Sequence, residues 1–197
     1  PHKENINYFT VDLSQRENVN SFCDSIINEY GGVSVVINNA GITQDTIFMR
    51  MSDSSWDNVF AVNLDASMVI CRKFIRGMIK NKWGRIVNIS SVVASTGNPG
   101  QSNYVAAKGA LNGLTKSMAL EVATRGVTVN CISPGFIDTA MTAKLTDDQK
   151  SKITEKIPMG RMGTGDDISS LALFLVSNEA SYITGQNIHV NGGLFLA

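Results

Sequence analysis

The sequence is poor in the residues that build disulfide frameworks and metal centres. Its 197 residues include three cysteines and two histidines. Cys23, Cys71 and Cys131 are odd in number, have no C-x-x-C spacing and lie within apolar patterns, which indicates buried free thiols in a reducing compartment rather than disulfides or catalytic groups. Neither His2 nor His189 has a partner at ligand spacing, so we expect no metal site.

The sequence also has no excess of charge of one sign and no long apolar run. The 17 basic and 17 acidic residues balance, which gives no indication of a nucleic-acid or membrane surface. No apolar run reaches the length of a membrane span, and the first residues contain no signal-like segment. With 43% hydrophobic and 17% charged residues, the composition is that of a globular protein. We therefore expect a cytoplasmic protein in which residues 1–197 form a single domain.

Short β-branched runs alternate along the chain with amphipathic stretches at helical spacing. This alternation predicts an α/β protein with a largely parallel sheet. We expect strands at residues 8–11, 33–37, 85–89, 127–132 and 186–190. We expect helices at residues 15–30, 53–79, 103–125 and 166–177, with a further short helix after Thr146.

The segment Gly84–Lys108 combines a buried strand, a turn and the start of a helix. Its strand runs out into Ser90-Ser91, at the sheet edge where open α/β sheets bind their ligands. After a loop rich in turn residues, the helix carries Tyr104 and Lys108, which are four residues apart and so lie on one face. Ser91 precedes Tyr104 by 13 residues.

This spacing predicts acid–base chemistry. A free tyrosine has a pKa of about 10, and an ammonium group within roughly 4–6 Å lowers it. Tyr104 with Lys108 could then protonate a carbonyl oxygen as it becomes an alkoxide, and the Ser91 hydroxyl could hold that oxygen. The alternative is a surface Tyr and Lys on an amphipathic helix beside an ordinary Ser-Ser loop. The strand–loop–helix context favours the catalytic interpretation.

Five motifs, in this order and at these separations, resemble those of the short-chain dehydrogenase/reductases. They are Asn38-Asn39-Ala40-Gly41, Ser91, Tyr104 with Lys108, Pro134-Gly135, and an ending with Tyr182-Ile183-Thr184-Gly185 and Val190-Asn191-Gly192-Gly193. The resemblance covers essentially the whole chain. The segment GNPGQSNYVAAK and the ending are similar to the β-ketoacyl-acyl-carrier-protein reductases within that family.

The resemblance implies a Rossmann-type, doubly wound parallel sheet with helices on both faces, and a nicotinamide dinucleotide cofactor. Asp12 would contact the adenine, the backbone of Ile137 the nicotinamide carboxamide, and Thr139 the carboxamide or a phosphate. The cofactor-binding positions that it implies are Asp12, Leu13, Asn38, Ala40, Gly41, Tyr104, Lys108, Pro134, Gly135, Ile137 and Thr139.

Four catalytic positions follow from the same resemblance. Tyr104 protonates the substrate oxygen and Ser91 positions it, so both would bind substrate. Lys108 lowers the pKa of the tyrosine and holds the ribose. Asn63, in the middle of an apolar helical pattern, would hold a water that links Lys108 to solvent. The simpler alternative for Asn63 is a side-chain bond to a neighbouring backbone group.

The glycine-rich turn that receives the pyrophosphate in dinucleotide sites is missing, as is the family's T-G-x-x-x-G-x-G. The chain opens at what matches the family's third strand, so the first βαβ unit is absent and we expect the natural protein to be longer. The residue that discriminates NAD from NADP normally lies in that unit. NADP(H) is therefore implied by the resemblance alone, and NAD(H) stays open.

The function implied is NADPH-dependent reduction of a 3-oxoacyl thioester, carried by acyl-carrier protein, by a homotetramer in fatty acid synthesis. Alternatives are an acetoacetyl-CoA reductase, another short-chain carbonyl reductase or alcohol dehydrogenase, and a non-catalytic dinucleotide-binding scaffold. A serine hydrolase is disfavoured, because no S-x-x-K or G-x-S-x-G surrounds Ser91.

Overall fold

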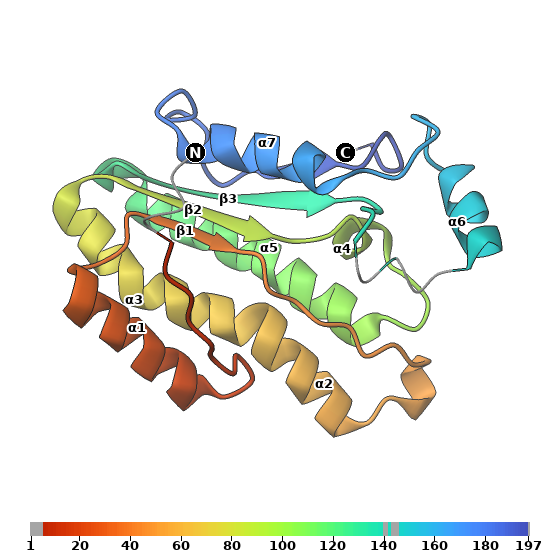
Figure 1. Ribbon diagram of the computed structural model, residues 1–197, viewed down its shortest axis with the longest axis horizontal. Coiled ribbons are helices and arrows are strands. Elements are labelled where there is room, and N and C mark those ends of the chain that lie inside the picture. The colour runs from red at the N-terminus through yellow and green to blue at the C-terminus, as the bar shows by residue number, and fades with distance from the viewer. Residues whose placement is uncertain (1–5, 140–141, 143–145, 197) are drawn as a thin grey trace.

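A four-stranded parallel sheet forms the centre of the molecule (Figure 1). The computed structural model describes residues 6–139, 142 and 146–196. The strands, in their spatial order, are β1 (Val35–Asn38), β2 (Gly84–Ile89), β3 (Val127–Pro134) and β4 (Asn187–Val190). Each neighbouring pair is parallel, so the α/β prediction is confirmed. The reversal of strand order that makes a sheet doubly wound does not occur within these residues.

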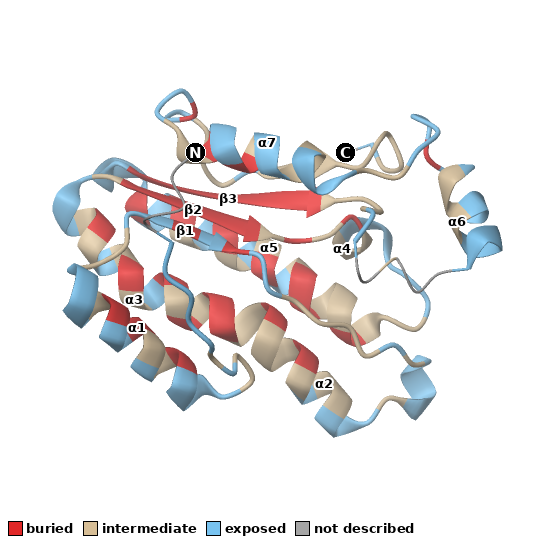
Figure 2. Ribbon diagram, viewed as in Figure 1, coloured by how far each residue is buried: buried red, intermediate tan, exposed pale blue. Residues whose placement is uncertain are grey.

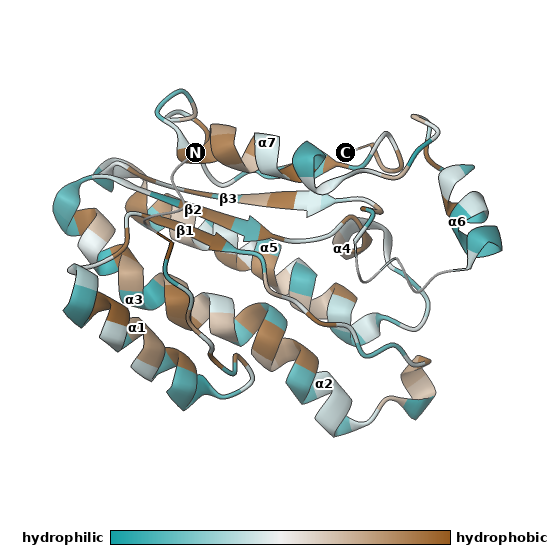
Figure 3. Cartoon of the chain, in the orientation of Figure 1, coloured by the Kyte–Doolittle hydropathy of each residue, from teal (hydrophilic) through white to brown (hydrophobic). Residues whose placement is uncertain are grey.

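Helices cover both faces of the sheet. They are α1 (Arg16–Tyr30), α2 (Asp53–Phe60), α3 (Ala66–Asn81), α4 (Val93–Thr96), α5 (Ser102–Val122), α6 (Asp147–Thr154) and α7 (Gly165–Val176), with 3-10 turns at Phe48–Arg50 and Ala123–Arg125 and a π-helical turn at Ala61–Asp65. Figure 1 shows α1, α3 and α5 on one side of the sheet and α7 on the other. Colouring by hydropathy shows α6, at the far end, to be largely hydrophilic (Figure 3).

The sheet separates two apolar clusters, because successive strand residues point to opposite faces. Val36, Ile86 and Val129 face the cluster under α1, α3 and α5, whereas Val87 and Ile132 face the one under α7. The two central strands, β2 and β3, are the most continuously buried elements (Figure 2). Each fully buried aliphatic side chain stabilises the fold by roughly 1.5–3 kcal/mol. This packing holds the carboxyl ends of β1, β2 and β3 side by side.

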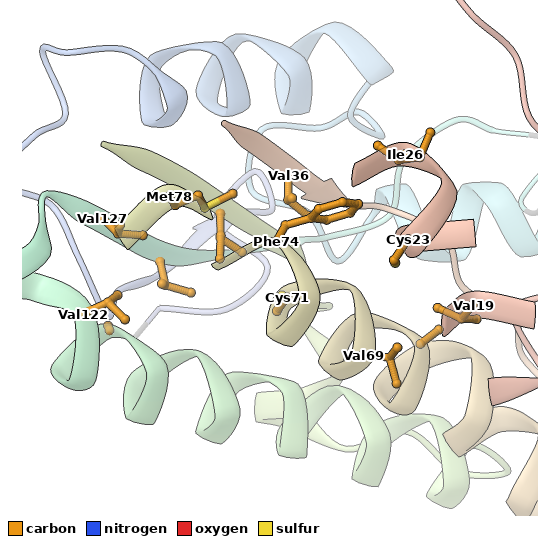
Figure 4. Close-up of a cluster of buried hydrophobic side chains, with 14 residues drawn as sticks. Val19, Cys23, Ile26, Val36, Val69, Cys71, Phe74, Met78, Val122 and Val127 are labelled. Atoms are coloured by element: carbon orange, nitrogen blue, oxygen red, sulfur yellow. The ribbon is translucent and has the colours of Figure 1, made fainter. Parts of the chain in front are cut away.

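The three cysteines are buried free thiols, as predicted. Cys23 and Cys71 lie in the first apolar cluster, between α1, α3 and the sheet (Figure 4). Burial raises the pKa of Cys23 and Cys131 to about 11 and that of Cys71 to about 12. Thiols with such pKa values are protonated and unreactive near neutral pH.

The strand expected at residues 8–11 is wrong. These residues are extended but pair with no strand, and β1 is the edge of the sheet. Tyr8 is 88% exposed, and Phe9 packs against the rings of Phe22 and Tyr30. The aromatic and β-branched residues typical of a strand are present, but a strand needs a hydrogen-bonding neighbour as well.

Within the described residues, no helix has both the length and the apolar character needed to cross a membrane.

Candidate active site

A cavity of about 440 Å³ opens where β2 and β3 end and α5 begins, a size typical of small-molecule sites. It brings together five of the predicted site residues, which are Ser91, Tyr104, Gly135, Ile137 and Thr139. The other lining residues are Thr43, Asp45, Val92, Val93, Gln101, Phe136 and Thr142. The predicted serine and tyrosine therefore face one space.

Tyr104 and Ser91 line the same cavity. Burial of the phenol raises its pKa, the neighbouring Ser91 hydroxyl lowers it in part, and the negative charge of Asp45 raises it. The expectation that Lys108 lowers this pKa is not met here. The physical reason is that burial of the phenol has the largest effect, while the lysine nitrogen is directed at a backbone carbonyl. Tyr104 is thus a protonated phenol near neutral pH, as an acid catalyst needs.

Lys108 lies behind Tyr104 in the protein interior, with only 3% of its surface exposed. Its Nζ donates a hydrogen bond to the Ile89 carbonyl at 2.7 Å. Burial disfavours the ammonium form and lowers the pKa of Lys108 to about 8. The amine can therefore gain or lose a proton near neutral pH, next to the phenol.

Asn63 lies in the π-helical turn between α2 and α3, where the sequence predicted an uninterrupted helix. Its Nδ2 donates to the carbonyls of Val59 and Ile42, each at 2.9 Å, and its Oδ1 accepts from the Ile42 amide at 3.3 Å. The simpler alternative, a bond to neighbouring backbone, is therefore present. A π turn is common at functional sites. Nothing in the residue pattern indicated the extra residue of this turn.

Gly41 lies against the side chains of Asn63 and Lys108. A Cβ atom at Gly41 would lie 2.7 Å from Asn63 Oδ1 and 3.4 Å from Lys108 Nζ. The first distance is shorter than real Cβ contacts, so the amide would have to move. The glycine thus permits the close approach that holds both side chains.

We expect Gly41→Ala to destabilise the protein by about 1–3 kcal/mol through overpacking and to reduce turnover together with it. Gly77→Ala is the matched control, because its Cβ would meet nothing within 4 Å and alanine is the better helix former. Chemical denaturation of both variants measures the effect. A Gly41→Ala protein as stable as Gly77→Ala would show that the Asn63 amide moves at no cost.

The remaining predicted cofactor residues lie outside this cavity. The Asn38 side chain is buried and bonds Asn88 and Cys71, so only its backbone could meet a ligand. The Asp12 carboxylate accepts bonds from the amide and hydroxyl of Ser14. Leu13 lines a separate cleft of about 20 Å³ beside α1. Ala40 is exposed, and Pro134 ends β3 next to Gly135.

The cavity fits a nicotinamide group. Val92 and Phe136 supply apolar walls for a flat ring, and the backbone from Gly135 to Ile137 passes along the cavity beside Thr139. Asp45 and Gln101, joined by a 2.9 Å bond from Gln101 Nε2 to Asp45 Oδ2, form the polar side. Sequence reasoning missed both residues, because each lies in a loop without periodicity. In the described part of the chain, no three His, Cys, Asp or Glu side chains could share a metal ion.

Comparison with known proteins gives one family. A family model described as "Enoyl-(Acyl carrier protein) reductase" matches residues 2–195. The chain is 49% identical over 191 residues to "Nodulation protein G" of Rhizobium sp. strain N33, covering 97% of this chain and 78% of that protein. It is 46% identical to the 3-oxoacyl-[acyl-carrier-protein] reductase of Haemophilus influenzae (95% and 77% covered) and 49% identical to that of Aquifex aeolicus (94% and 75%). The chain belongs to the short-chain dehydrogenase/reductase family.

Proposed function

We propose that this protein reduces a 3-oxoacyl thioester, carried by acyl-carrier protein, to the 3-hydroxyacyl thioester with NADPH. The observation that carries the proposal is that Ser91 and Tyr104 line one cavity, with the Lys108 amine 5.7 Å from the Tyr104 ring centroid. Two hydroxyl groups that meet at a cavity wall suit a carbonyl oxygen. The names of the relatives from Haemophilus and Aquifex support this substrate.

The reduced nicotinamide, when bound, supplies the hydride that adds to the ketone carbon. Ser91 Oγ donates a hydrogen bond to the ketone oxygen and fixes its position. The Tyr104 phenol, kept protonated by burial, gives its proton to the same oxygen as negative charge develops on it. Lys108, whose pKa of about 8 lies near neutrality, returns a proton to the Tyr104 phenolate.

The cofactor positions stay proposals of the same kind. Gly135, Ile137 and Thr139 would hold the nicotinamide end, since they line the cavity beside Tyr104. Gly41 and Ala40, after β1, would lie along the ribose and adenosine portion, with Asp12 and Leu13 at its far end. We propose Asn63 as a proton-relay position that acts through its backbone or its remaining oxygen lone pair. NADPH is favoured over NADH only by the relatives.

We also propose the wider setting that the resemblance implied. Residues 1–197 would be one dinucleotide-binding domain, in a cytoplasmic homotetramer that works in fatty acid synthesis. The three buried free thiols support a reducing compartment. Gel filtration with light scattering tests the assembly, and a stable monomer that turns over substrate would contradict it.

The decisive experiment is NADPH oxidation by the purified protein in its full natural length. We expect turnover of acetoacetyl-acyl-carrier protein, with weaker turnover of acetoacetyl-CoA. A crotonyl thioester tests the enoyl reduction that the family model's description names. Preference for CoA would indicate an acetoacetyl-CoA reductase, and turnover of simple ketones alone another carbonyl reductase. Cofactor binding without turnover of any substrate would indicate a scaffold.

A further inference from the structure

Five polar side chains form an unbroken hydrogen-bonded chain through the interior, beneath the active site. Asn38 Nδ2 donates to Cys71 Sγ at 3.2 Å and to Asn88 Oδ1 at 2.7 Å. Asn88 Nδ2 donates to Thr115 Oγ1 at 2.8 Å, and Thr115 Oγ1 lies 3.1 Å from Cys131 Sγ. All five residues are at most 8% exposed. The chain thus joins β1, β2 and β3 to α3 and α5 without water.

The bonds impose one direction on this chain. Asn88 has its oxygen facing Asn38, so its amide hydrogens face Thr115. Thr115 Oγ1 accepts that hydrogen, and it donates its own to Cys131 Sγ when the single thiol hydrogen is directed at Leu111. The Cys131 thiol in turn points at the Leu111 carbonyl at 4.0 Å. Each donor therefore polarises the next, and loss of one link weakens its neighbours.

Three hydrogen bonds in the same region join the end of β2 to α5. Asn88 bonds Thr115, the Ile89 carbonyl accepts from Lys108 Nζ at 2.7 Å, and Ser90 Oγ donates to the Lys108 carbonyl at 3.2 Å. Thr115 lies seven residues after Lys108, about two turns along the same helix face. The last two residues of β2 and the residue after them thereby fix the position of α5 along β2.

We propose that Asn88 and Thr115 are positioning residues, which set the register between α5 and β2 and so hold Tyr104 against Ser91. The proposal rests on the proposed function, since Ser91 lies two residues after the end of β2 and Tyr104 stands in the first turn of α5. Apolar packing alone would permit sliding, because one apolar side chain can replace another in a contact. A directed bond between two fully buried polar groups does not permit it.

The test is Thr115→Val, which keeps the shape of the side chain and removes both its acceptor and its donor. A small displacement of catalytic groups lowers kcat strongly, so we expect about a tenfold loss of kcat with KM for the thioester and for NADPH unchanged. Thr115→Ser keeps the hydroxyl and should restore kcat to within about twofold of wild type. A Thr115→Val enzyme with wild-type kcat would overturn the proposal.

Thr128→Val is the matched control, since it makes the same replacement at a buried position, the second residue of β3. Its kcat should equal that of wild type. If Thr115→Val does not fold, Cys131→Ala cuts the same chain one link later and leaves Asn88 paired. It should lower kcat about threefold by loosening the Thr115 hydroxyl. An unchanged kcat in Cys131→Ala would then overturn the proposal.

A readout without substrate separates this proposal from the proposed function. The groups that face the Tyr104 phenol are Ser91, Asp45 and Lys108, and none of them is replaced. The Ser91 hydroxyl beside the phenol lowers its pKa, so we expect loss of register in Thr115→Val to raise it. Ultraviolet titration of tyrosinate, with the Tyr104→Phe spectrum subtracted, measures it. Absence of thioester turnover by wild type would contradict the proposed function. An unchanged Tyr104 pKa in Thr115→Val would contradict the register proposal.

Discussion

Tyr104→Phe is expected to lower the turnover of a 3-oxoacyl thioester by roughly 10²–10⁴-fold, the range that a positioned general acid contributes. The variant removes one oxygen, the acid that faces the cavity beside Ser91. Ring volume and packing are kept, so the protein should fold and bind NADPH as wild type does. The Ser91 hydroxyl can still bind the ketone oxygen, so KM should change much less than kcat.

Tyr182→Phe provides the control, because Tyr182 is fully exposed and far from the cavity in sequence and in space. Initial rates of NADPH oxidation at saturating substrate measure the effect. Thermal unfolding of both variants separates loss of chemistry from loss of fold. Turnover by Tyr104→Phe within a few-fold of wild type would remove this residue from the mechanism and with it the proposed proton path.

The helices and inner strands could be predicted because their pattern and their burial coincide. The β-branched run of β2 is buried from Gly84 to Asn88, and α5 begins within one residue of the expected start. The segment at residues 8–11 had the same local pattern but no neighbour with which to pair. Local sequence carries periodicity, whereas pairing is decided by another part of the chain.

The grouping of the candidate catalytic residues Ser91, Tyr104 and Lys108 could be predicted because strand ends and helix faces place them. The spacing of Tyr104 and Lys108 fixed them on one face, and Ser91 followed a strand that had to end at the ligand edge. The spacing did not reveal how deeply the Tyr104 phenol and Lys108 are buried, and burial raises the pKa of the phenol instead of leaving it lowered by the lysine. Nor did it reveal the π turn at Asn63, which depends on packing against Gly41 and Ile42.

Lys108→Met is expected to separate stability from activity. The methionine fills the buried stem but loses the amine near the Tyr104 ring and the bond to the Ile89 carbonyl. Turnover should fall roughly tenfold or more, since the variant loses the amine that we propose returns a proton to the Tyr104 phenolate. The unpaired carbonyl costs about 1–3 kcal/mol, whereas the buried ammonium of wild type is itself unfavourable near neutrality.

The sign of the pH dependence follows from the lowered pKa of Lys108. Between about pH 8 and the ordinary lysine value of 10.5, the unfolded chain holds a proton that the folded chain has released. Unfolding therefore takes up a proton, and the contribution of Lys108 to the unfolding free energy rises by up to roughly 3 kcal/mol across this interval. Below about pH 8 the lysine is charged in both the folded and the unfolded state. Its burial then lowers the unfolding free energy by an amount that does not change with pH.

Urea unfolding of wild type and Lys108→Met, from about pH 7 to pH 10.5, tests this directly. The three buried thiols and Tyr104 have raised pKa values, so both proteins lose stability as the pH rises past the ordinary values of those groups. Because these groups are common to both, their effects largely cancel in the difference.

The unfolding free energy of wild type should rise relative to that of the variant as the pH rises, and Lys108→Met should be at least as stable near neutrality. A difference that stays flat would mean that Lys108 is solvated in the folded protein, contrary to its burial behind Tyr104. The protein would then hold its lysine at no cost, whereas burial of Lys108 and its lowered pKa indicate that the charged amine costs stability.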